Sequence, residues 1–218
     1  GIDDTSAVIN LKDKLTGSGR EGNNIYLTID HELQKKAYNL LGDRKGAVIA
    51  LNPKTGEILA MVSKPDFNPD ESELEKNWSN MVDDEDSPFL TRATQGLYTP
   101  GSTFKVVISA AAIENNLGNE IFEDIGTITI DGKKISNSGE KAYGNIDIKT
   151  ALAVSSNVVF ATIGCELGED TLKDIAQRVG LGSSIPFDIP TSTSSFKYNK
   201  MSKADMAAVG IGQGKLLV

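Results

Sequence analysis

The sequence is poor in the residues that hold metal ions or form disulfide bonds. Its 218 residues include one cysteine, Cys165, and one histidine, His31. A single cysteine excludes a disulfide within the chain, and one cysteine with one histidine argues against a zinc site. We interpret Cys165 as a small core residue and His31 as a polar residue at the start of a helix. The sequence predicts no metal and no cofactor.

Long apolar runs and a surplus of positive charge are also absent. No stretch is long enough to span a membrane as a helix, and there is no signal-peptide pattern. The net charge is −8 with acidic and basic residues interspersed, which argues against nucleic acid as a partner. Apolar residues make up 39% of the chain, which is enough for a globular core. Because the chain begins at Gly1 rather than at a methionine, we expect it to be part of a longer protein.

The order of the predicted elements indicates an α+β fold. Residues 1–23 are polar and aperiodic, which predicts a linker segment, and residues 24–218 predict one domain. Strands come first and helices follow without βαβ alternation, so we expect a mainly antiparallel sheet. A long surface loop with room for one short helix is expected over residues 64–95. Periodicity and turn residues predict strands over residues 25–29, 46–51, 57–62, 127–130 and 133–135, and helices over residues 30–41, 102–114, 147–154, 158–167 and 170–179.

Residues 102–105 bring a serine and a lysine to the start of an apolar helix. The Pro-Gly turn at residues 100–101 precedes Ser102, and no helix breaker follows before residue 115. We expect this helix to be buried, because it is apolar on nearly all sides. Ser102 and Lys105 are three residues apart and should share one helical face.

This arrangement suits nucleophilic catalysis by a serine. Burial lowers the pKa of a lysine, so a neutral Lys105 amine can accept a proton from the Ser102 hydroxyl. Free backbone N–H groups at the start of a helix can stabilise an oxyanion. The spacing by itself is weak evidence, since it occurs in Ser102/Lys105, Ser138/Lys141 and Ser194/Lys197. Only the first pair precedes a long apolar helix, whereas the other two lie in polar segments without helical periodicity.

A second polar cluster, residues 155–157, interrupts an apolar helical pattern with Ser-Ser-Asn. Serine and asparagine disfavour helix interiors, so the cluster predicts a junction between two helices. The simplest interpretation is a cap, with Ser155 or Ser156 starting the second helix. A catalytic interpretation gains weight from the order of the motifs, because S-x-x-K followed about fifty residues later by S-x-N is typical of penicillin-recognising serine transferases.

Taken together, these motifs resemble the class B penicillin-binding proteins, which are peptidoglycan D,D-transpeptidases. Further matching stretches are residues 28–34, 46–63, 92–93 and 212–214, so that the resemblance covers roughly residues 24–218. It implies the α+β fold of penicillin-binding proteins and serine β-lactamases, with a mainly antiparallel sheet and a helical subdomain. It also implies a serine acyl-enzyme that cross-links D-Ala-D-Ala stem peptides and is acylated by β-lactams.

The resemblance implies a role for each of four residues. Ser102 would attack the carbonyl between the two D-alanines, or the β-lactam carbonyl, and its backbone N–H would supply half of the oxyanion hole. Lys105 would be the base, and Ser155 would relay a proton to the leaving group. Asn157 would hold the substrate's amide and help to position Lys105. The family further implies a membrane anchor, action on the extracytoplasmic face of the cell membrane, and a membrane glycosyltransferase as partner.

One family motif is absent from its expected place. The third motif, Lys-Thr/Ser-Gly on a strand beside the site, follows S-x-N in the family, whereas the only Lys-Thr-Gly here is upstream, at residues 54–56. Asn52, Pro53 and Gly56 explain that tripeptide as a hairpin turn. We therefore expect the C-terminal strands with the third motif to lie outside this chain, and the 218 residues alone to be weakly active or inactive.

Several other functions match part of this pattern. Class D β-lactamases share Ser-Thr-Phe-Lys but follow it with Ser-x-Val, and no E-x-x-L-N of class A follows Ser102. A D,D-carboxypeptidase differs only in its acceptor, and a β-lactam sensor or a non-catalytic wall-synthesis scaffold would keep the fold, so these alternatives stay open. Residues 210–215 do not match a nucleotide-binding P-loop, because Val209 stands where the motif requires glycine and Leu216 stands where it requires serine or threonine.

Overall fold

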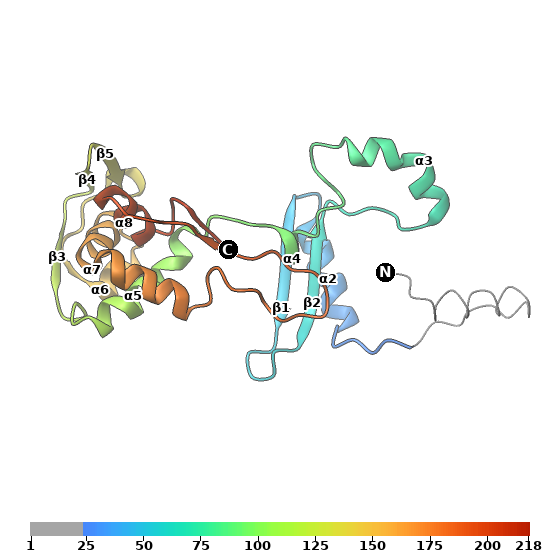
Figure 1. Ribbon diagram of the computed structural model, residues 1–218, viewed down its shortest axis with the longest axis horizontal. Helices are drawn as coiled ribbons and strands as arrows, with labels where there is room; N and C mark the ends of the chain where they lie inside the picture. The colour runs from blue at the N-terminus through green and yellow to red at the C-terminus, as the bar shows by residue number, and fades with distance from the viewer. Residues whose placement is uncertain (1–23) are drawn as a thin grey trace, which may run out of the picture. The chain divides into compact units, whose positions relative to one another are not determined.

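The computed structural model describes residues 24–218, which cluster into two compact units (Figure 1). Within the described residues, the first unit comprises residues 24–42 and 48–62, and the second comprises residues 43–47 and 63–218. The predicted N-terminal linker lies outside the described residues. None of the helices in the described part of the chain has both the length and the apolar character that a membrane crossing requires.

The first unit pairs a helix with a β-hairpin. Helix α2 (His31–Leu41) is capped by Asp30, whose carboxylate accepts a hydrogen bond from Leu33 N at 2.9 Å, as the sequence predicted. Gln34 ties the helix to the hairpin, because its side-chain amide donates to Met61 O at 2.8 Å and accepts from Met61 N at 2.7 Å.

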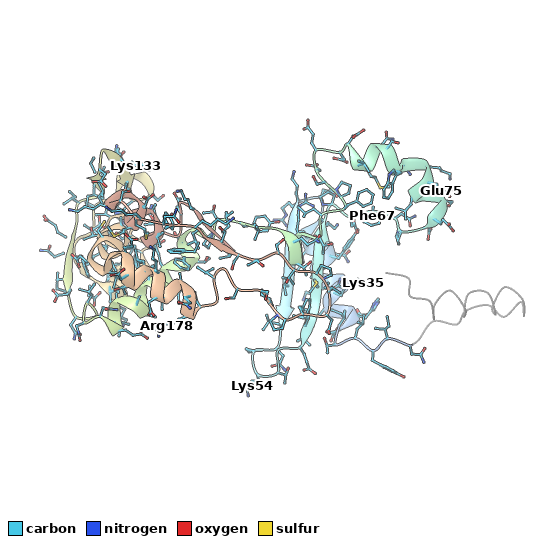
Figure 2. The ribbon with its side chains drawn as sticks, viewed as in Figure 1. Lys35, Lys54, Phe67, Glu75, Lys133 and Arg178 are labelled. Atoms are coloured by element: carbon cyan, nitrogen blue, oxygen red, sulfur yellow. The ribbon has the colours of Figure 1, made fainter. Side chains whose placement is uncertain are left out.

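The hairpin consists of β1 (Gly46–Leu51) and β2 (Ile58–Lys64), which form a two-stranded sheet close to the predicted one. Its turn contains the Lys-Thr-Gly tripeptide, and Figure 2 shows Lys54 in this turn. Gly56 has a φ of 78° and donates its N–H to Asn52 O at 2.8 Å. The interpretation of this tripeptide as turn residues is therefore confirmed.

The strand predicted over residues 25–29 does not form. The segment reaches β2 through two hydrogen bonds, from Thr28 Oγ1 to Ile58 O at 2.6 Å and from Asp30 N to Leu59 O at 2.9 Å. Among the described residues, no strand pairs with this segment along its length, so the hydrogen-bond ladder of a sheet does not form. The prediction was wrong because alternation reports a possible strand and not the partner that a strand requires.

The core of the second unit is helical. Helices α5 (Lys105–Glu114) and α6 (Ile148–Ala153) pack with α7 (Asn157–Arg178), which also lies against α8 (Lys203–Gly210) (Figure 1). Helix α7 breaks at Gly168, where φ is 76°, so it contains the two helical stretches that the sequence predicted. The largest apolar side chains on these helices with less than 2% of their surface exposed are Phe160, Ile108, Ile163, Leu172, Val158, Val159 and Val209.

Three antiparallel two-stranded sheets accompany these helices in the described part of the second unit. They pair β3 (Ile121–Asp124) with β6 (Gly144–Asp147), β4 (Thr127–Ile130) with β5 (Lys133–Ser136), and β7 (Ser195–Phe196) with β8 (Leu216–Leu217). The β4–β5 hairpin turns through Asp131 and Gly132, whose φ values of 47° and 77° match the predicted Asp-Gly turn. The predicted α+β class with antiparallel strands is therefore confirmed.

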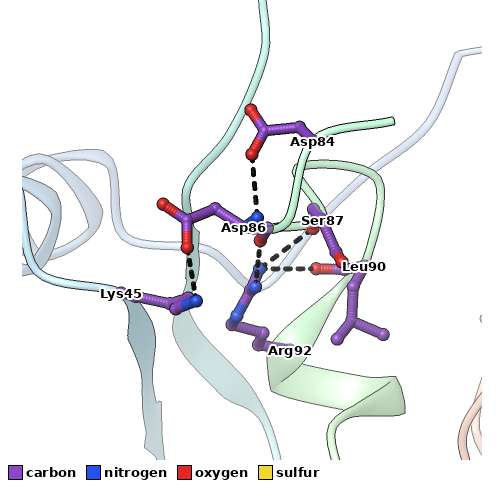
Figure 3. Close-up of polar contacts among 6 residues, drawn as sticks. All are labelled: Lys45, Asp84, Asp86, Ser87, Leu90 and Arg92. Carbon is purple, nitrogen blue, oxygen red and sulfur yellow. Dashed lines mark hydrogen bonds and ion pairs between the residues drawn. The ribbon is translucent and has the colours of Figure 1, made fainter. Parts of the chain in front are cut away.

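The segment before the central helix folds around a buried arginine. It contains two helices, α3 (Glu71–Val82) and α4 (Arg92–Gln95), where the sequence predicted a loop with room for one. Arg92 is 7% exposed, and its guanidinium donates to the backbone carbonyls of Asp86, Ser87 and Leu90 (Figure 3). Lys45 pairs with the Asp86 carboxylate on the outside of this arrangement. The Arg92 guanidinium therefore serves as hydrogen-bond donor to three backbone carbonyls that would otherwise need separate partners.

Two helices of the second unit depart from the prediction. Helix α5 begins at Lys105, because residues 101–104 form a 3₁₀ turn, η1 (Gly101–Phe104). It is also less buried than expected, with Val106 and Ile113 63% and 61% exposed, since α6 and α7 pack on one side of it. Helix α8 was missed, although Ser202 and Asp205 form a capping box at its start.

Helices α7 and α8 approach each other closely at a pair of glycines. A Cβ on Gly164 would lie 2.4 Å from Met206 O, and one on Gly210 would lie 2.2 Å from Phe160 O. Real Cβ atoms do not come so close to backbone oxygens, so both helices need glycine at the contact. Any side chain there would push the helices apart.

We predict that Gly164→Ala lowers the free energy of unfolding by about 1–3 kcal/mol, the usual cost of overpacking a core. Urea denaturation would measure the change. Gly118→Ala is the control, because its Cβ would meet a flexible side-chain atom of Ile113 at 3.3 Å. Equal midpoints for Gly164→Ala and the unsubstituted protein would contradict the close packing.

Candidate active site

Ser102 lies in the η1 turn, which packs against the loop that follows α8. Gly101 has a φ of 58° and donates its N–H to Gly212 O at 2.8 Å. The two backbones come so close that a Cβ on Gly212 would lie 1.9 Å from Gly101 O. Thr103 Oγ1 donates to Pro100 O at 2.7 Å and closes the turn. The Pro-Gly turn therefore delivers Ser102 to the start of the helical segment, as the sequence predicted, and the Ser102 side chain is exposed there.

Lys105 is the first residue of α5 and has no exposed surface. Its Nζ donates to Ser155 O at 2.8 Å, to Asn157 Oδ1 at 2.8 Å and to Ser155 Oγ at 3.1 Å. These acceptors match the three N–H donors of a lysine ammonium, and the centroid of the Phe160 ring lies 5.5 Å from Nζ. Burial lowers the pKa of Lys105 to about 8, so a neutral amine is accessible near neutral pH.

Ser155 connects the lysine to Ser102. Its Oγ accepts from Lys105 Nζ at 3.1 Å and donates to Ser102 Oγ at 3.1 Å. We expected Ser102 and Lys105 to meet directly on one helical face, but the described hydrogen bonds place Ser155 Oγ between them. The reason is local, because Ser102 lies in the 3₁₀ turn before the α-helix that begins at Lys105. Since hydroxyl protons rotate freely, the three groups form a path for a proton in either direction.

The polar cluster at residues 155–157 is a junction between α6 and α7. Ser155 has a φ of 56°, in the left-handed region that serine rarely adopts. Ser156 caps α7 by accepting from Val159 N at 3.0 Å, so the interpretation of the cluster as a cap is confirmed for this residue. Asn157 begins α7, and its Nδ2 donates to Ser136 O at 2.8 Å, which leaves Oδ1 facing Lys105.

The structure brings the four predicted site residues together from η1, α5 and this junction: Ser102, Lys105, Ser155 and Asn157. The serines of the other two S-x-x-K pairs lie in other segments of the second unit. Ser138 starts a short 3₁₀ turn, η2 (Ser138–Glu140), and Ser194 precedes β7 and accepts from Gly182 N at 3.1 Å. Neither opens an α-helix, as the sequence predicted.

The lone histidine and cysteine take ordinary structural positions. His31 is the first residue of α2, as predicted. Cys165 is only half-buried on α7 and packs against the core, so the interpretation of it as a core residue was wrong. Its thiol donates to Lys203 O at 3.3 Å, and burial raises its pKa. Among the described residues, no three or more His, Cys, Asp or Glu side chains are arranged to hold a metal ion.

Two buried polar residues near the site were missed by the sequence analysis. Asp124 at the end of β3 and Asn137 just after β5 contact the junction at residues 155–157. Their local sequence is typical of strand ends and turns, so a single sequence contains no signal that would select them.

Comparison with known proteins identifies a matching family. The model of the penicillin binding protein transpeptidase domain matches residues 46–218. The chain is 31% identical over an alignment of 217 residues to penicillin-binding protein 3 of Bacillus subtilis, covering 90% of this chain and 31% of that protein. It is 30% identical over 210 residues to the peptidoglycan D,D-transpeptidase MrdA of Acinetobacter baumannii, covering 88% of this chain and 31% of that protein.

The similarity extends to solved structures. Penicillin-binding protein A from M. tuberculosis, determined as its penicillin G acyl-enzyme complex, matches with a TM-score of 0.84 and 29% identity. That match covers 100% of this chain and 54% of the other. The chain thus spans 31% of the length of the two curated relatives above and about half of this solved chain.

We predict that Lys105 titrates at about 8, whereas exposed lysines titrate at about 10.4. Loss of the proton should be visible in NMR spectra of the protein labelled with ¹³C at lysine Cε, because that shift follows the charge of the amine. The signal is assigned by its disappearance in Lys105→Met. A midpoint near 10.4 for the assigned signal would mean that Nζ is solvated and not buried.

Proposed function

The chain belongs to the family of penicillin-binding protein transpeptidase domains, and on that premise we propose that it carries the serine acyl-transfer site of a peptidoglycan D,D-transpeptidase. The observation that carries the proposal is the hydrogen-bonded line from Lys105 Nζ through Ser155 Oγ to Ser102 Oγ, in which both distances are 3.1 Å. It joins an exposed hydroxyl to a buried amine, which is the pairing that an activated serine nucleophile needs.

In the proposed acylation step, Ser102 Oγ attacks the carbonyl carbon between the two D-alanines of a stem peptide. The neutral Lys105 amine accepts the hydroxyl proton through Ser155, which contacts both groups. The backbone N–H of Ser102 contributes one donor to the oxyanion. When the C–N bond breaks, Ser155 passes the proton to the amine of the departing D-alanine, and an ester remains on Ser102.

In the second step, the amine of another stem peptide attacks that ester and releases Ser102, and the new amide cross-links the wall. Asn157 serves both steps. Its Oδ1 accepts from Lys105 Nζ at 2.8 Å, and one of its two amide hydrogens is bonded to Ser136 O. The other amide hydrogen is available to the backbone of the substrate.

We further propose that β-lactams acylate the same serine, since opening the strained lactam ring requires the same attack on an amide carbonyl. The M. tuberculosis relative forms acyl-enzyme complexes with penicillin G and with imipenem, which supports this proposal. Stem peptides lie outside the cytoplasmic membrane, so we place the activity at the extracytoplasmic face of the cell membrane. A membrane glycosyltransferase, which supplies uncross-linked glycan strands, is the proposed partner.

The first prediction of the proposed function is a covalent adduct. Incubation of the protein encoded by the complete gene with benzylpenicillin should add the mass of one penicillin, and Ser102→Ala should abolish the adduct. Ser138→Ala and Ser194→Ala are matched controls, because these serines have the same spacing to a lysine without the site. Absence of an adduct in the folded protein would refute the proposal.

The lifetime of the adduct separates the remaining alternatives. An adduct that persists for many minutes fits a transpeptidase, a D,D-carboxypeptidase or a β-lactam sensor. Formation of a new peptide cross-link between stem peptides, with release of D-alanine, then identifies the transpeptidase. Rapid loss of the adduct with continuing hydrolysis of penicillin would indicate a β-lactamase instead.

The second prediction concerns pH. The acylation rate constant should rise about tenfold for each pH unit below about 8 and level off above it, because only the neutral form of Lys105 accepts a proton. Lys105→Met should lower the rate about 100-fold or more and remove this dependence. Lys197→Met, from an unrelated S-x-x-K pair, should leave the profile unchanged. A flat profile between pH 6 and 9 would exclude Lys105 as the base.

A further inference from the structure

Beneath the junction at residues 155–157 lies a pair of buried polar side chains that no motif in the sequence marks. Asp124 is fully buried at the end of β3, and Asn137 is 5% exposed just after β5. We propose that Asp124 and Asn137 are positioning residues for acylation, which hold Ser155 and Asn157 where Lys105 and Ser102 require them. This inference rests on the proposed function, because it predicts a change in the rate of that reaction.

Asp124 holds the middle of the junction. Its Oδ2 accepts from Ser156 Oγ at 2.6 Å and from Asn137 Nδ2 at 2.9 Å. Its Oδ1 accepts from Gly126 N at 2.9 Å and from Asn137 Nδ2 at 2.7 Å. A buried carboxylate is costly without donors, and these contacts supply a donor to each oxygen. Because the Ser156 side chain points to Asp124, the side chains of its neighbours Ser155 and Asn157 point to Lys105 Nζ.

Asn137 holds the start of α7. Its Oδ1 accepts from Asn157 N at 2.7 Å and from Val158 N at 3.1 Å, two of the N–H groups that a helix start leaves without partners. Its Nδ2 also donates to Lys141 O at 2.8 Å, so both ends of the Asn137 amide are held by hydrogen bonds. The preceding residue, Ser136, accepts from the Asn157 side chain. The end of β5 therefore fixes both the backbone and the amide of Asn157.

The conformation of Ser155 explains why the junction needs support from Asp124 and Asn137. Its φ of 56° is unfavourable for serine, so the residue keeps this conformation only where its surroundings impose it. In this conformation both the carbonyl and the hydroxyl of Ser155 accept from Lys105 Nζ, at 2.8 and 3.1 Å. Ser156 Oγ already caps α7 through Val159 N, so Asp124 and Asn137 add constraint to the junction beyond a simple cap.

The test compares acylation in Asp124→Asn and in the unsubstituted protein encoded by the complete gene. The substitution keeps the size of the side chain, but its new NH₂ group faces a hydrogen-bond donor in either orientation. We expect the rate constant for acylation by benzylpenicillin to fall about 10- to 100-fold, the range found when residues that orient metal-binding side chains are replaced. The fall should lie in the acylation step and not in the dissociation constant of the preceding complex.

Two further variants separate positioning from stability. Leu172→Ala removes a fully buried side chain from the second half of α7, away from the junction, and should destabilise the fold while the acylation rate per folded molecule stays the same. Ser156→Ala deletes the one hydroxyl that links Asp124 to the junction and should slow acylation about fivefold. It replaces Asp124→Asn if that variant fails to fold.

The Lys105 titration gives a readout that does not depend on catalysis. If the junction loosens, water reaches Nζ, and the Lys105 pKa should rise from about 8 toward its ordinary value in Asp124→Asn. An unchanged acylation rate in a folded Asp124→Asn would overturn the inference and leave the proposed function intact. If the unsubstituted protein is not acylated, the proposed function fails. In that case the Lys105 titration still tests the inference, because an unchanged Lys105 pKa in Asp124→Asn would show that Asp124 does not hold the junction in place.

Discussion

The burial of one amine is the constraint on which the site depends. Lys105 has no exposed surface, and a buried ammonium is tolerated only with acceptors for its three hydrogens. Ser155 O, Ser155 Oγ and Asn157 Oδ1 provide them. The same burial lowers the pKa of the amine to about 8. Burial therefore brings the neutral form of the amine within reach near neutral pH, and the junction between α6 and α7 supplies the acceptors that the buried amine needs.

The rest of the second unit can be understood as support for that arrangement. Gly101 and Gly212 let the turn that carries Ser102 approach the loop after α8, and Gly164 and Gly210 let α7 approach α8. From the other side, the β3 and β5 ends deliver Asp124 and Asn137 to the start of α7. Close packing at glycines and a fully bonded polar cluster are both intolerant of displacement, which suits a site that must hold three groups in line.

Much of the fold was accessible from the sequence where the signal was local. The cap at Asp30, the turns at residues 54–56 and 131–132, and the helix break at Gly168 follow from single residue types with strong backbone preferences. The strand over residues 25–29 failed because alternation does not supply a partner strand. Helix α8 was overlooked although its capping box, Ser202 with Asp205, was present in the sequence.

The sequence by itself determined that a serine and a lysine stand at the start of an apolar helix, and that Ser-Ser-Asn interrupts another, because these are properties of neighbouring residues. Only the tertiary structure decided that Ser155 lies between Ser102 and Lys105, and that Asp124 and Asn137 lie beneath the junction. These residues are far apart along the chain, and no local preference encodes their contacts. Such contacts arise only when packing of the helices and strands brings the segments together and a buried polar group requires a partner.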